Sequence, residues 1–548
     1  MNKSANTLIQ QTQKFRKTTG FYKRSLDKAI YKYHLSRRLK VIINSVIIAF
    51  PALLQFIFFS DIKYLVSFLI CISFLLSFFF LFRLRLMLTF PFVVISFAFS
   101  IYIALYSQSP GATAIMAIFN TKLEAIIGFL KSPRILAGLI VLSIILLGYI
   151  RLVLMGSRPG EEKELPYLRA RRYVLFIMLA ASICLYVPVR SHLNTTYPFS
   201  IIYNSTSYVK ILARMEKVSE REYIFKGTLD SNFRQKTGTF ILILGESSRR
   251  ANWSLYGYRR NTNVFLKGVM SERPRNFILL KDYLSTAQTT YPNMMTIFSL
   301  LPSKNFAEIP DYPSFTRIMK RVSFRTYFIS TYTNIFSNFI SADKNIIVDS
   351  KDDLSLLPEI REVLEDRQDA RKLIIVHLRD SHLAFSGYEY TYEDYVSPTN
   401  KPMVDKYDNS IIHTGEFLKG LTAQVLGSSE PVFAWYMPDH GENLNDFNDG
   451  NYGHGTSGFT RYELELPSIM FFNDAFIAAN PEIRRVSKNS GFRTSHSNVS
   501  NTFLGLSGIY PDEYRGDLDL SSQDFEEGEP YIIDENLFPI RYSKAKIQ

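Results

Sequence analysis

Long apolar runs dominate the first 188 residues, whereas short apolar runs alternate with polar stretches in the rest of the chain. Five of the long runs are sufficient, or nearly so, to cross a bilayer as helices. They are Val41–Phe59, Tyr64–Phe82, Leu88–Tyr106, Ile135–Met155 and Tyr173–Val187. The pattern therefore predicts an α-helical membrane domain of five transmembrane helices over 41–188, after an arm formed by residues 1–40.

The later part, 238–548, has the pattern of a soluble α/β domain. Helical stretches separate its strand candidates, which are Phe240–Leu244, Arg325–Ile329, Leu373–His377, Val432–Met437 and Ser468–Phe472. Such alternation predicts a mostly parallel central sheet with helices on both faces. Residues 189–237 form a connector, in which helical spacing over Ser207–Arg221 predicts an interfacial helix.

The formal net charge of +13 is concentrated beside the apolar runs. Residues 1–40 carry 11 lysines and arginines, and the turn at Arg83 and the segment Arg151–Arg172 are also basic. The positive-inside rule then predicts a cytoplasmic N-terminus and, after five spans, a C-terminal domain outside the membrane, which in a bacterium is the periplasm. Because membrane topology explains the basic excess, we expect no nucleic-acid partner.

Both cysteines, Cys71 and Cys184, lie in apolar runs of the membrane domain. The soluble domain therefore has no disulfide framework and no cysteine-based zinc site. Any metal bound by that domain must take its ligands from His, Asp, Glu or hydroxyl groups.

Polar side chains follow three of the predicted strands where each strand ends. Glu246 follows the first strand, His382 the third, and Asp439 and His440 the fourth. Ligands of open α/β sheets bind just beyond the carboxyl ends of the strands, so these side chains predict one shared site. Carboxylate and neutral imidazole suit zinc or manganese. His454, between two glycines, is a further candidate for a substrate or metal contact, with a surface loop as the alternative.

Three hydroxyls, Thr286, Thr289 and Thr290, precede Pro292 and an apolar helical pattern. Hydroxyls at a helix start often serve as caps. They can also be nucleophiles, since a metal-bound threonine has a lowered pKa and a helix N-terminus cradles phosphate. Both interpretations stay open at this point.

A short polar segment interrupts the apolar part of the chain within the loop Ser107–Arg134. Asn120 and Glu124 in this loop are expected on the same side of the membrane as the soluble domain. They are compatible with contact to a substrate head group and equally with the capping of a short interfacial helix.

Six motifs occur in a specific order along the chain. They are GESSRRANWSLYGYRRNTN (245–263), TTYPNMMTIFSLLP (289–302), HLRDSH (377–382), KYDNS (406–410), PDHGENL (438–444) and YGHG (452–455). Together they resemble the membrane-bound phosphoethanolamine transferases of Gram-negative envelopes. That family consists of five-span inner-membrane enzymes with a periplasmic alkaline phosphatase/sulfatase-like domain, and the resemblance covers essentially the whole chain.

The resemblance implies a set of zinc ligands. They would be Glu246, a threonine of the 286–290 cluster, Asp439 and His440. His382 and His454 would handle the phosphoryl group or hold a second zinc, and the remaining threonines, with Asn120 and Glu124, would contact substrate.

The choice of nucleophile depends on spacing. Sulfatase-like enzymes place the nucleophile two residues before a proline, with Ser or Thr nine residues after the nucleophile, and Thr290 fits this pattern through Pro292 and Ser299. Thr286 and then Thr289 are the next candidates. The familiar lipid A enzymes place their threonine five residues before the proline, a position occupied here by Ala287.

The implied activity is zinc-dependent transfer of phosphoethanolamine from phosphatidylethanolamine through a phosphothreonine intermediate. The acceptor would be lipid A, lipopolysaccharide core or another glycan, and the enzyme would be a monomer that contacts membrane lipids. The lack of cysteines in the soluble domain argues against lipid A, because lipid A members carry several disulfides there. The alternatives are a phosphoglycerol transferase of the same fold and a non-catalytic membrane-anchored binding protein.

Overall fold

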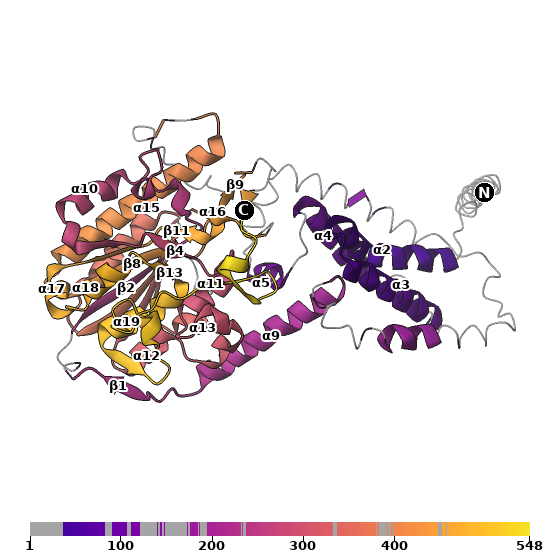
Figure 1. The fold of residues 1–548 in the computed structure, drawn as a ribbon, viewed down its shortest axis with the longest axis horizontal. Helices are drawn as coiled ribbons and strands as arrows, with labels where there is room; N and C mark the ends of the chain where they lie inside the picture. Colours follow the sequence, from indigo (N-terminus) through magenta and orange to yellow (C-terminus); the bar gives the residue numbers. More distant parts are fainter. Residues whose placement is uncertain are drawn as a thin grey trace, which may run out of the picture. The chain divides into compact units, whose positions relative to one another are not determined.

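The computed structural model describes residues 37–82, 90–106, 111–120, scattered positions between 140 and 194, and 196–548 with short gaps. The gaps are 232, 234–236, 332–336, 380, 383–391, 393–395, 398, 448–451 and 456–457. The chain forms two compact units (Figure 1). They comprise Met1–Pro110 with Lys122–Tyr203, and Gly111–Thr121 with Asn204–Gln548.

Apolar helices build the first unit. Helix α2 (Arg37–Phe59) packs against α3 (Ile62–Phe82) and α4 (Phe90–Tyr106). In the part of the chain that the structure describes, one helix, Val41–Phe59, is long and apolar enough to cross a membrane, with a mean hydropathy of 2.3. Most of the fourth expected span lies outside the described residues, as does part of the fifth.

The connector contains a longer helix than its sequence pattern predicts. Helix α9 (Phe199–Glu220) begins directly after Pro198, eight residues before the predicted start at Ser207. The turn before it is anchored in the first unit. The amide of Tyr197 donates to Gln55 Oε1 at 2.9 Å, and Ser67 Oγ donates to the Tyr197 carbonyl at 2.7 Å.

A seven-stranded sheet forms the centre of the second unit. Its strand order is β3-β12-β8-β2-β7-β5-β6, and β8, β2, β7, β5 and β6 are parallel. These strands are β2 (Gly238–Gly245), β3 (Phe277–Leu279), β5 (Arg325–Ser330), β6 (Lys344–Ile347), β7 (Arg371–His377), β8 (Val432–Pro438) and β12 (Ile469–Phe472). The sheet is mixed rather than uniformly parallel, because β12 runs antiparallel to both β8 and β3.

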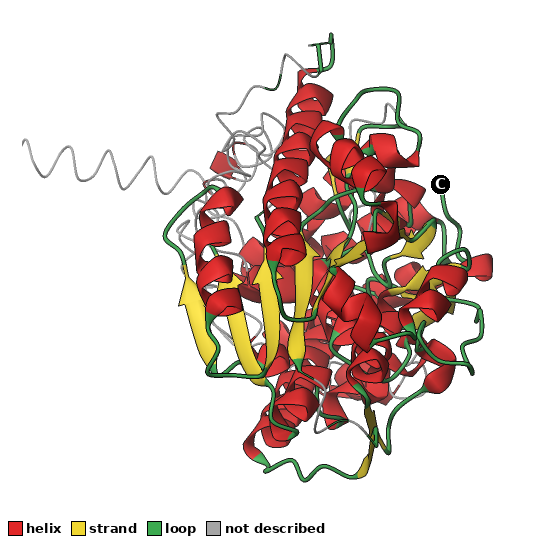
Figure 2. Ribbon diagram, turned by 90° about the vertical axis from the view of Figure 1, so that its left-hand side faces the viewer, coloured by secondary structure: helices red, strands yellow, loops and turns green. Residues whose placement is uncertain are grey.

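Both faces of the sheet are buried, which explains the unbroken apolar run of β2. Phe240, Leu242 and Leu244 point into one core cluster, and Ile241 and Ile243 point into the other. Helices α11, α12 and α19 contribute to the first cluster, and α14 and α15 to the second, so that helices flank the strands (Figure 2). They are α11 (Thr290–Ile297), α12 (Phe315–Arg321), α14 (Leu356–Glu365), α15 (Pro402–Gly427) and α19 (Val499–Ser507).

Smaller strands lead into the loops around the carboxyl end of the sheet. A three-stranded sheet joins β11 (Glu465–Leu466), β4 (Asp282–Leu284) and β13 (Arg493–Ser495), of which β4 and β13 are parallel. A hairpin pairs β9 (Asn443–Leu444) with β10 (Tyr452–Gly453). Helix α5 (Ala112–Asn120) also belongs to this unit, where the Thr113 amide donates to the Glu535 carbonyl at 3.0 Å.

The buried ring of Phe503 offers a direct test of this core. Phe503 stacks on Trp435 with ring centroids 6.0 Å apart. Phe503→Ala should lower the free energy of unfolding by about 3–5 kcal/mol, because it leaves a cavity in the core.

Tryptophan fluorescence during denaturant unfolding of the full chain measures this loss. The chain has two tryptophans, Trp253 and Trp435, and both are buried in this unit, so their fluorescence reports its stability. Phe492, which is 41% exposed, is the control. Equal losses for Phe503→Ala and Phe492→Ala would contradict this account.

Candidate metal centre

Three predicted ligands converge where two adjacent parallel strands end. Gly245 of β2 lies opposite Pro438 of β8, so Glu246 and Asp439 leave the sheet side by side. The ligand atoms of Glu246, Asp439 and His440 all lie within 4.8 Å of one another, and all three residues are buried. His440 Nε2 is 3.6 Å from Glu246 Oε1 and 3.3 Å from Asp439 Oδ2.

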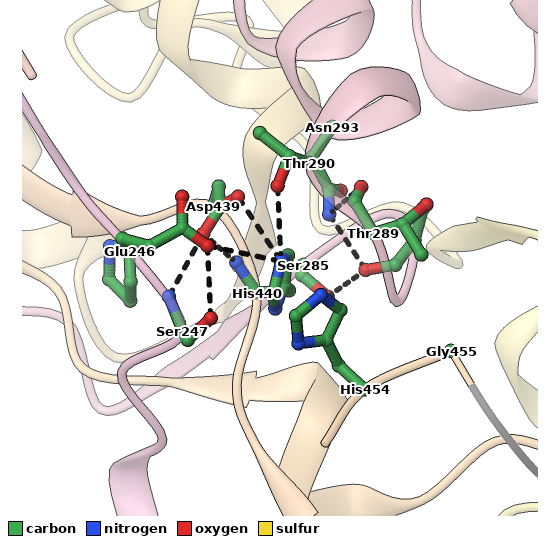
Figure 3. Close-up of polar contacts among 12 residues, drawn as sticks. Glu246, Ser247, Ser285, Thr289, Thr290, Asn293, Asp439, His440, His454 and Gly455 are labelled. Atoms are coloured by element: carbon green, nitrogen blue, oxygen red, sulfur yellow. Dashed lines mark hydrogen bonds and ion pairs between the residues drawn. The ribbon is translucent and has the colours of Figure 1, made fainter. Parts of the chain in front are cut away.

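Thr290 brings a hydroxyl to this cluster from the start of α11. Its Oγ1 lies 3.3 Å from His440 Nε2, and Figure 3 marks this contact with a dashed line. Thr289 is the residue that precedes the helix. Because Thr290 is the first residue of α11, its hydroxyl lies at the N-terminal end of the helix dipole, where anionic groups are favoured.

The electrostatics of the cluster favour a bound cation. Burial, with the nearby charge of Asp439, raises the pKa of Glu246 well above its usual range. Burial also lowers the pKa of His440 well below its usual range, and this favours the neutral imidazole that ligates metals. Asp439 Oδ2 accepts no hydrogen bond from the described residues. Two carboxylates, a neutral imidazole and a hydroxyl fit zinc, which would offset the crowding of negative charge.

A strained turn holds Glu246 in place. Ser247 has φ of 55°, in the left-handed region that a residue with a side chain rarely adopts. Its amide donates to Asp439 Oδ1 at 3.1 Å, and its carbonyl accepts from the Tyr407 hydroxyl at 2.7 Å. Ser247 Oγ donates to Glu246 Oε1 at 2.9 Å. The serine therefore holds both carboxylates of the cluster, Asp439 through its amide and Glu246 through its hydroxyl.

His454 approaches the cluster on the β9–β10 hairpin. Its ring centroid is 4.0 Å from that of His440, and its Nδ1 is 3.1 Å from Glu442 Oε2. Burial opposes a charge on His454, but the carboxylate of Glu442 overcomes this effect and raises the pKa to about 9. Glu442 is absent from the residues predicted from the sequence, although its position two residues after His440 is a usable signal.

His382 and the other threonines occupy distinct positions around the cluster. The His382 amide donates to the Arg379 carbonyl at 3.3 Å, and its charge contributes to the low pKa of His440. The Thr286 hydroxyl donates to Asn293 Oδ1 at 3.0 Å, so it is engaged in the turn. Thr289 Oγ1 is buried without a hydrogen-bond partner among the described residues. Of the three threonines, Thr290 is the one whose hydroxyl contacts the predicted ligands.

The structure does not describe the predicted substrate contacts of the apolar part of the chain. Helix α5 ends at Asn120, whose side chain is outside the described residues, and Glu124 lies outside them entirely. Both residues stay predictions.

The second unit is similar to known proteins. The model of the Sulfatase family matches residues 238–509. Phosphoethanolamine transferase EptC of Escherichia coli (strain K12) is 24% identical over 353 residues, which cover 56% of this chain and 60% of that protein. Phosphoethanolamine transferase EptA of Helicobacter pylori is 24% identical over 260 residues, which cover 43% of this chain and 48% of that protein. The chain thus spans about three-fifths or less of these relatives, and the matches confirm the resemblance noted in the sequence.

Solved structures show the same fold. The integral membrane protein lipooligosaccharide phosphoethanolamine transferase A (EptA) from Neisseria meningitidis aligns with a TM-score of 0.65 at 19% identity, covering 87% of this chain and 98% of that one. The C-terminal periplasmic domain of EptC from Escherichia coli, in complex with zinc, aligns with a TM-score of 0.54 at 21% identity. It covers 59% of this chain and 98% of that one.

Metal analysis of a charge-neutral variant tests the centre. Glu246→Gln keeps the size of the side chain but removes a carboxylate ligand. Its zinc affinity should fall by more than about tenfold, the loss that even outer-shell changes produce. Metal content after dialysis against a graded zinc buffer measures the change. Glu465→Gln, which alters a carboxylate paired with Arg250, is the control. Equal zinc content in the two variants would rule out Glu246 as a ligand.

Proposed function

We propose that this chain, whose residues 238–509 match the model of the Sulfatase family, is a metal-dependent phosphoethanolamine transferase. It moves phosphoethanolamine from phosphatidylethanolamine to an acceptor of the bacterial envelope through a phosphothreonine intermediate. The observation that carries the proposal is the Thr290 hydroxyl, 3.3 Å from His440 and beside the buried carboxylates of Glu246 and Asp439. The names of the relatives supply the donor group.

Glu246, Thr290, Asp439 and His440 would hold one zinc ion. Zinc bound there would lower the pKa of the threonine hydroxyl and stabilise negative charge on the phosphoryl oxygens. The zinc complex of the EptC domain supports this choice of metal. His382 and His454 are the candidates for a second ion or for contact with the phosphoryl group. The raised pKa of His454 favours the contact with the phosphoryl group, because a metal ligand must be a neutral imidazole.

The chain's own residues account for a balanced first step. Thr290 Oγ forms a bond to phosphorus, and the bond from phosphorus to the diacylglycerol oxygen breaks. A protonated histidine beside the site gives its proton to that leaving oxygen, and the hydroxyl proton of Thr290 replaces it on the histidine. His454 suits this role because Glu442 holds its Nδ1 and raises its pKa to about 9, which leaves Nε2–H available for transfer.

The second step reverses the roles. A hydroxyl or phosphate oxygen of the acceptor bonds to phosphorus, the bond to Thr290 Oγ breaks, and the acceptor's proton returns to the threonine through the same histidine. Thr289, directly before Thr290, would contact the bound phosphoethanolamine through a hydroxyl that has no hydrogen-bond partner among the described residues. Thr286, four residues before Thr290, stays a predicted contact, although its hydroxyl donates to Asn293 Oδ1.

The membrane context follows from the apolar helices and the basic arm. We propose a multi-pass protein of the bacterial inner membrane, with five spans, a cytoplasmic N-terminus and a periplasmic catalytic domain. The likeness to the Neisseria membrane protein over 87% of the chain supports this topology. Asn120 and Glu124 would meet the head group of a lipid substrate. Lipid A, lipopolysaccharide core and another glycan are the acceptors to compare.

Two substitutions of one residue test the proposal. Thr290→Val keeps the branched shape but removes the hydroxyl, so transfer should fall by at least about a thousandfold, as expected for loss of a nucleophile. Thr290→Ser keeps a hydroxyl and should retain measurable transfer. Mass spectrometry of lipid A, core and glycan fractions from cells that express each variant detects the added phosphoethanolamine and identifies the acceptor. Equal modification in Thr290→Val and wild-type cells would exclude Thr290 as the nucleophile.

A further inference from the structure

The amide of one buried residue, Asn293, holds the turn that presents Thr290. Its Oδ1 accepts from both the amide and the hydroxyl of Thr286, each at 3.0 Å. Its Nδ2 donates to the Ala287 carbonyl at 2.8 Å and to the Thr289 carbonyl at 3.0 Å, and Figure 3 shows the side chain directed toward this turn. Exchanging oxygen and nitrogen would oppose donor to donor, so these contacts fix the orientation of the amide.

A second buried side chain, His496, connects this turn to the metal-ligand turn. His496 Nδ1 lies 3.1 Å from Asn293 Oδ1, and Nε2 lies 3.1 Å from the carbonyl of Pro438. Pro438 ends β8 and directly precedes Asp439. Both partners are acceptors, and burial lowers the pKa of His496 to about 4, so the neutral ring donates one hydrogen bond, to Asn293 Oδ1 or to the Pro438 carbonyl, and contacts the other by packing. Asn293 and His496 therefore lie between the segment that bears the threonine and the segment that bears Asp439 and His440 and contact both.

Local structure holds His496 in this position. Strand β13 runs parallel to β4, with Ser495 opposite Leu284, so His496 and the turn after β4 leave neighbouring strands. Ser495 and Asn498 form a capping box around the short helix that His496 begins. The His496 ring also packs edge-on against Tyr283, with centroids 5.5 Å apart.

We propose that Asn293 and His496 are positioning residues that keep the Thr290 hydroxyl in line with the metal ligands. Among the described residues, neither side chain hydrogen-bonds to Thr290 Oγ1 or to a ligand atom. Both act through the carbonyls of the two turns and through their contact with each other. Thr290 Oγ1 and His440 Nε2, 3.3 Å apart, belong to turns that follow strands of different sheets, β4 and β8. Because a misplacement of about 1 Å can lower a rate about 100-fold, the bridge sets the rate of attack. This inference rests on the proposed role of Thr290.

Steady-state kinetics of two full-chain variants test the bridge. Asn293→Ala removes all of the amide contacts, and its kcat should fall about 100-fold. His496→Phe keeps a planar ring without nitrogen atoms, and its kcat should fall about 10- to 100-fold. In both variants zinc content should equal that of the wild type and KM for phosphatidylethanolamine should stay within about threefold, since ligands and substrate contacts are intact. His496→Gln, whose amide can donate either to Asn293 Oδ1 or to the Pro438 carbonyl, should recover part of the loss.

Asn501→Ala is the matched control. Asn501 is buried in the segment that follows His496, and its amide donates to the Leu300 carbonyl at 3.0 Å and accepts from the Arg515 amide at 2.9 Å. Its substitution removes a similar bridge that does not reach the threonine turn, so kcat of the folded protein should be retained. If Asn293→Ala does not fold, His496→Phe carries the test with the same control.

Two results would overturn the bridge. One is a kcat for Asn293→Ala and His496→Phe equal to that of Asn501→Ala. The other is a loss of zinc in parallel with the loss of kcat, which would assign these residues to metal affinity. Thr290→Val separates this proposal from the proposed function: if that variant still transfers, the nucleophile assignment fails, and if it is inactive while the bridge variants match the control, the bridge alone fails.

Discussion

The register between strands β2 and β8 is the constraint on which the candidate centre depends. With Gly245 opposite Pro438, the residues that follow each strand, Glu246 and Asp439, must leave the sheet side by side in a buried environment. The ligand atoms of these two carboxylates lie within 4.8 Å of each other, so their negative charges repel. Burial, with the charge of Asp439, raises the pKa of Glu246 strongly. A shift of one residue would turn one of these carboxylates to the other face of the sheet, because side chains alternate along a strand.

Polar contacts around the strand ends keep this arrangement from relaxing. Tyr407 bridges the strained turn, since its hydroxyl donates to the Ser247 carbonyl and accepts from the Arg249 amide at 2.8 Å. The guanidinium of Arg249 donates in turn to the Glu442 carbonyl at 3.1 Å and pairs with Asp446. The loop that carries Glu442, the partner of His454, is thereby tied to the loop that carries Glu246. These buried hydrogen bonds offset the backbone strain of Ser247.

The local pattern was sufficient to predict the inner strands of the sheet and the three side chains, Glu246, Asp439 and His440, that meet at their ends. Short apolar runs that stop at a glycine or a proline identify β2 and β8. The residues after them are polar, as expected where a ligand binds beyond the carboxyl ends of the strands. Edge strands carried a weaker signal: β6 is exposed, and β3 is only three residues long. The early start of α9 at Phe199 was missed because its first turns contain polar and aromatic residues without clear periodicity.

The bridging residues could not be found from the sequence, because their roles depend on contacts between distant segments. Asn293 and His496 are 203 positions apart, and neither resembles a ligand or a nucleophile in its local context. The choice among three threonines needed the position of α11 as well as the spacing to Pro292.

The central claim is that Thr290, held beside Glu246, Asp439 and His440, bonds to phosphorus during transfer. The most direct measurement is peptide mass spectrometry of the full-length protein quenched during turnover with phosphatidylethanolamine, with fragmentation that locates the adduct. The account predicts a phosphoethanolamine group on Thr290. An adduct on Thr286, Thr289 or Ser247, or transfer without any adduct on the protein, would contradict it.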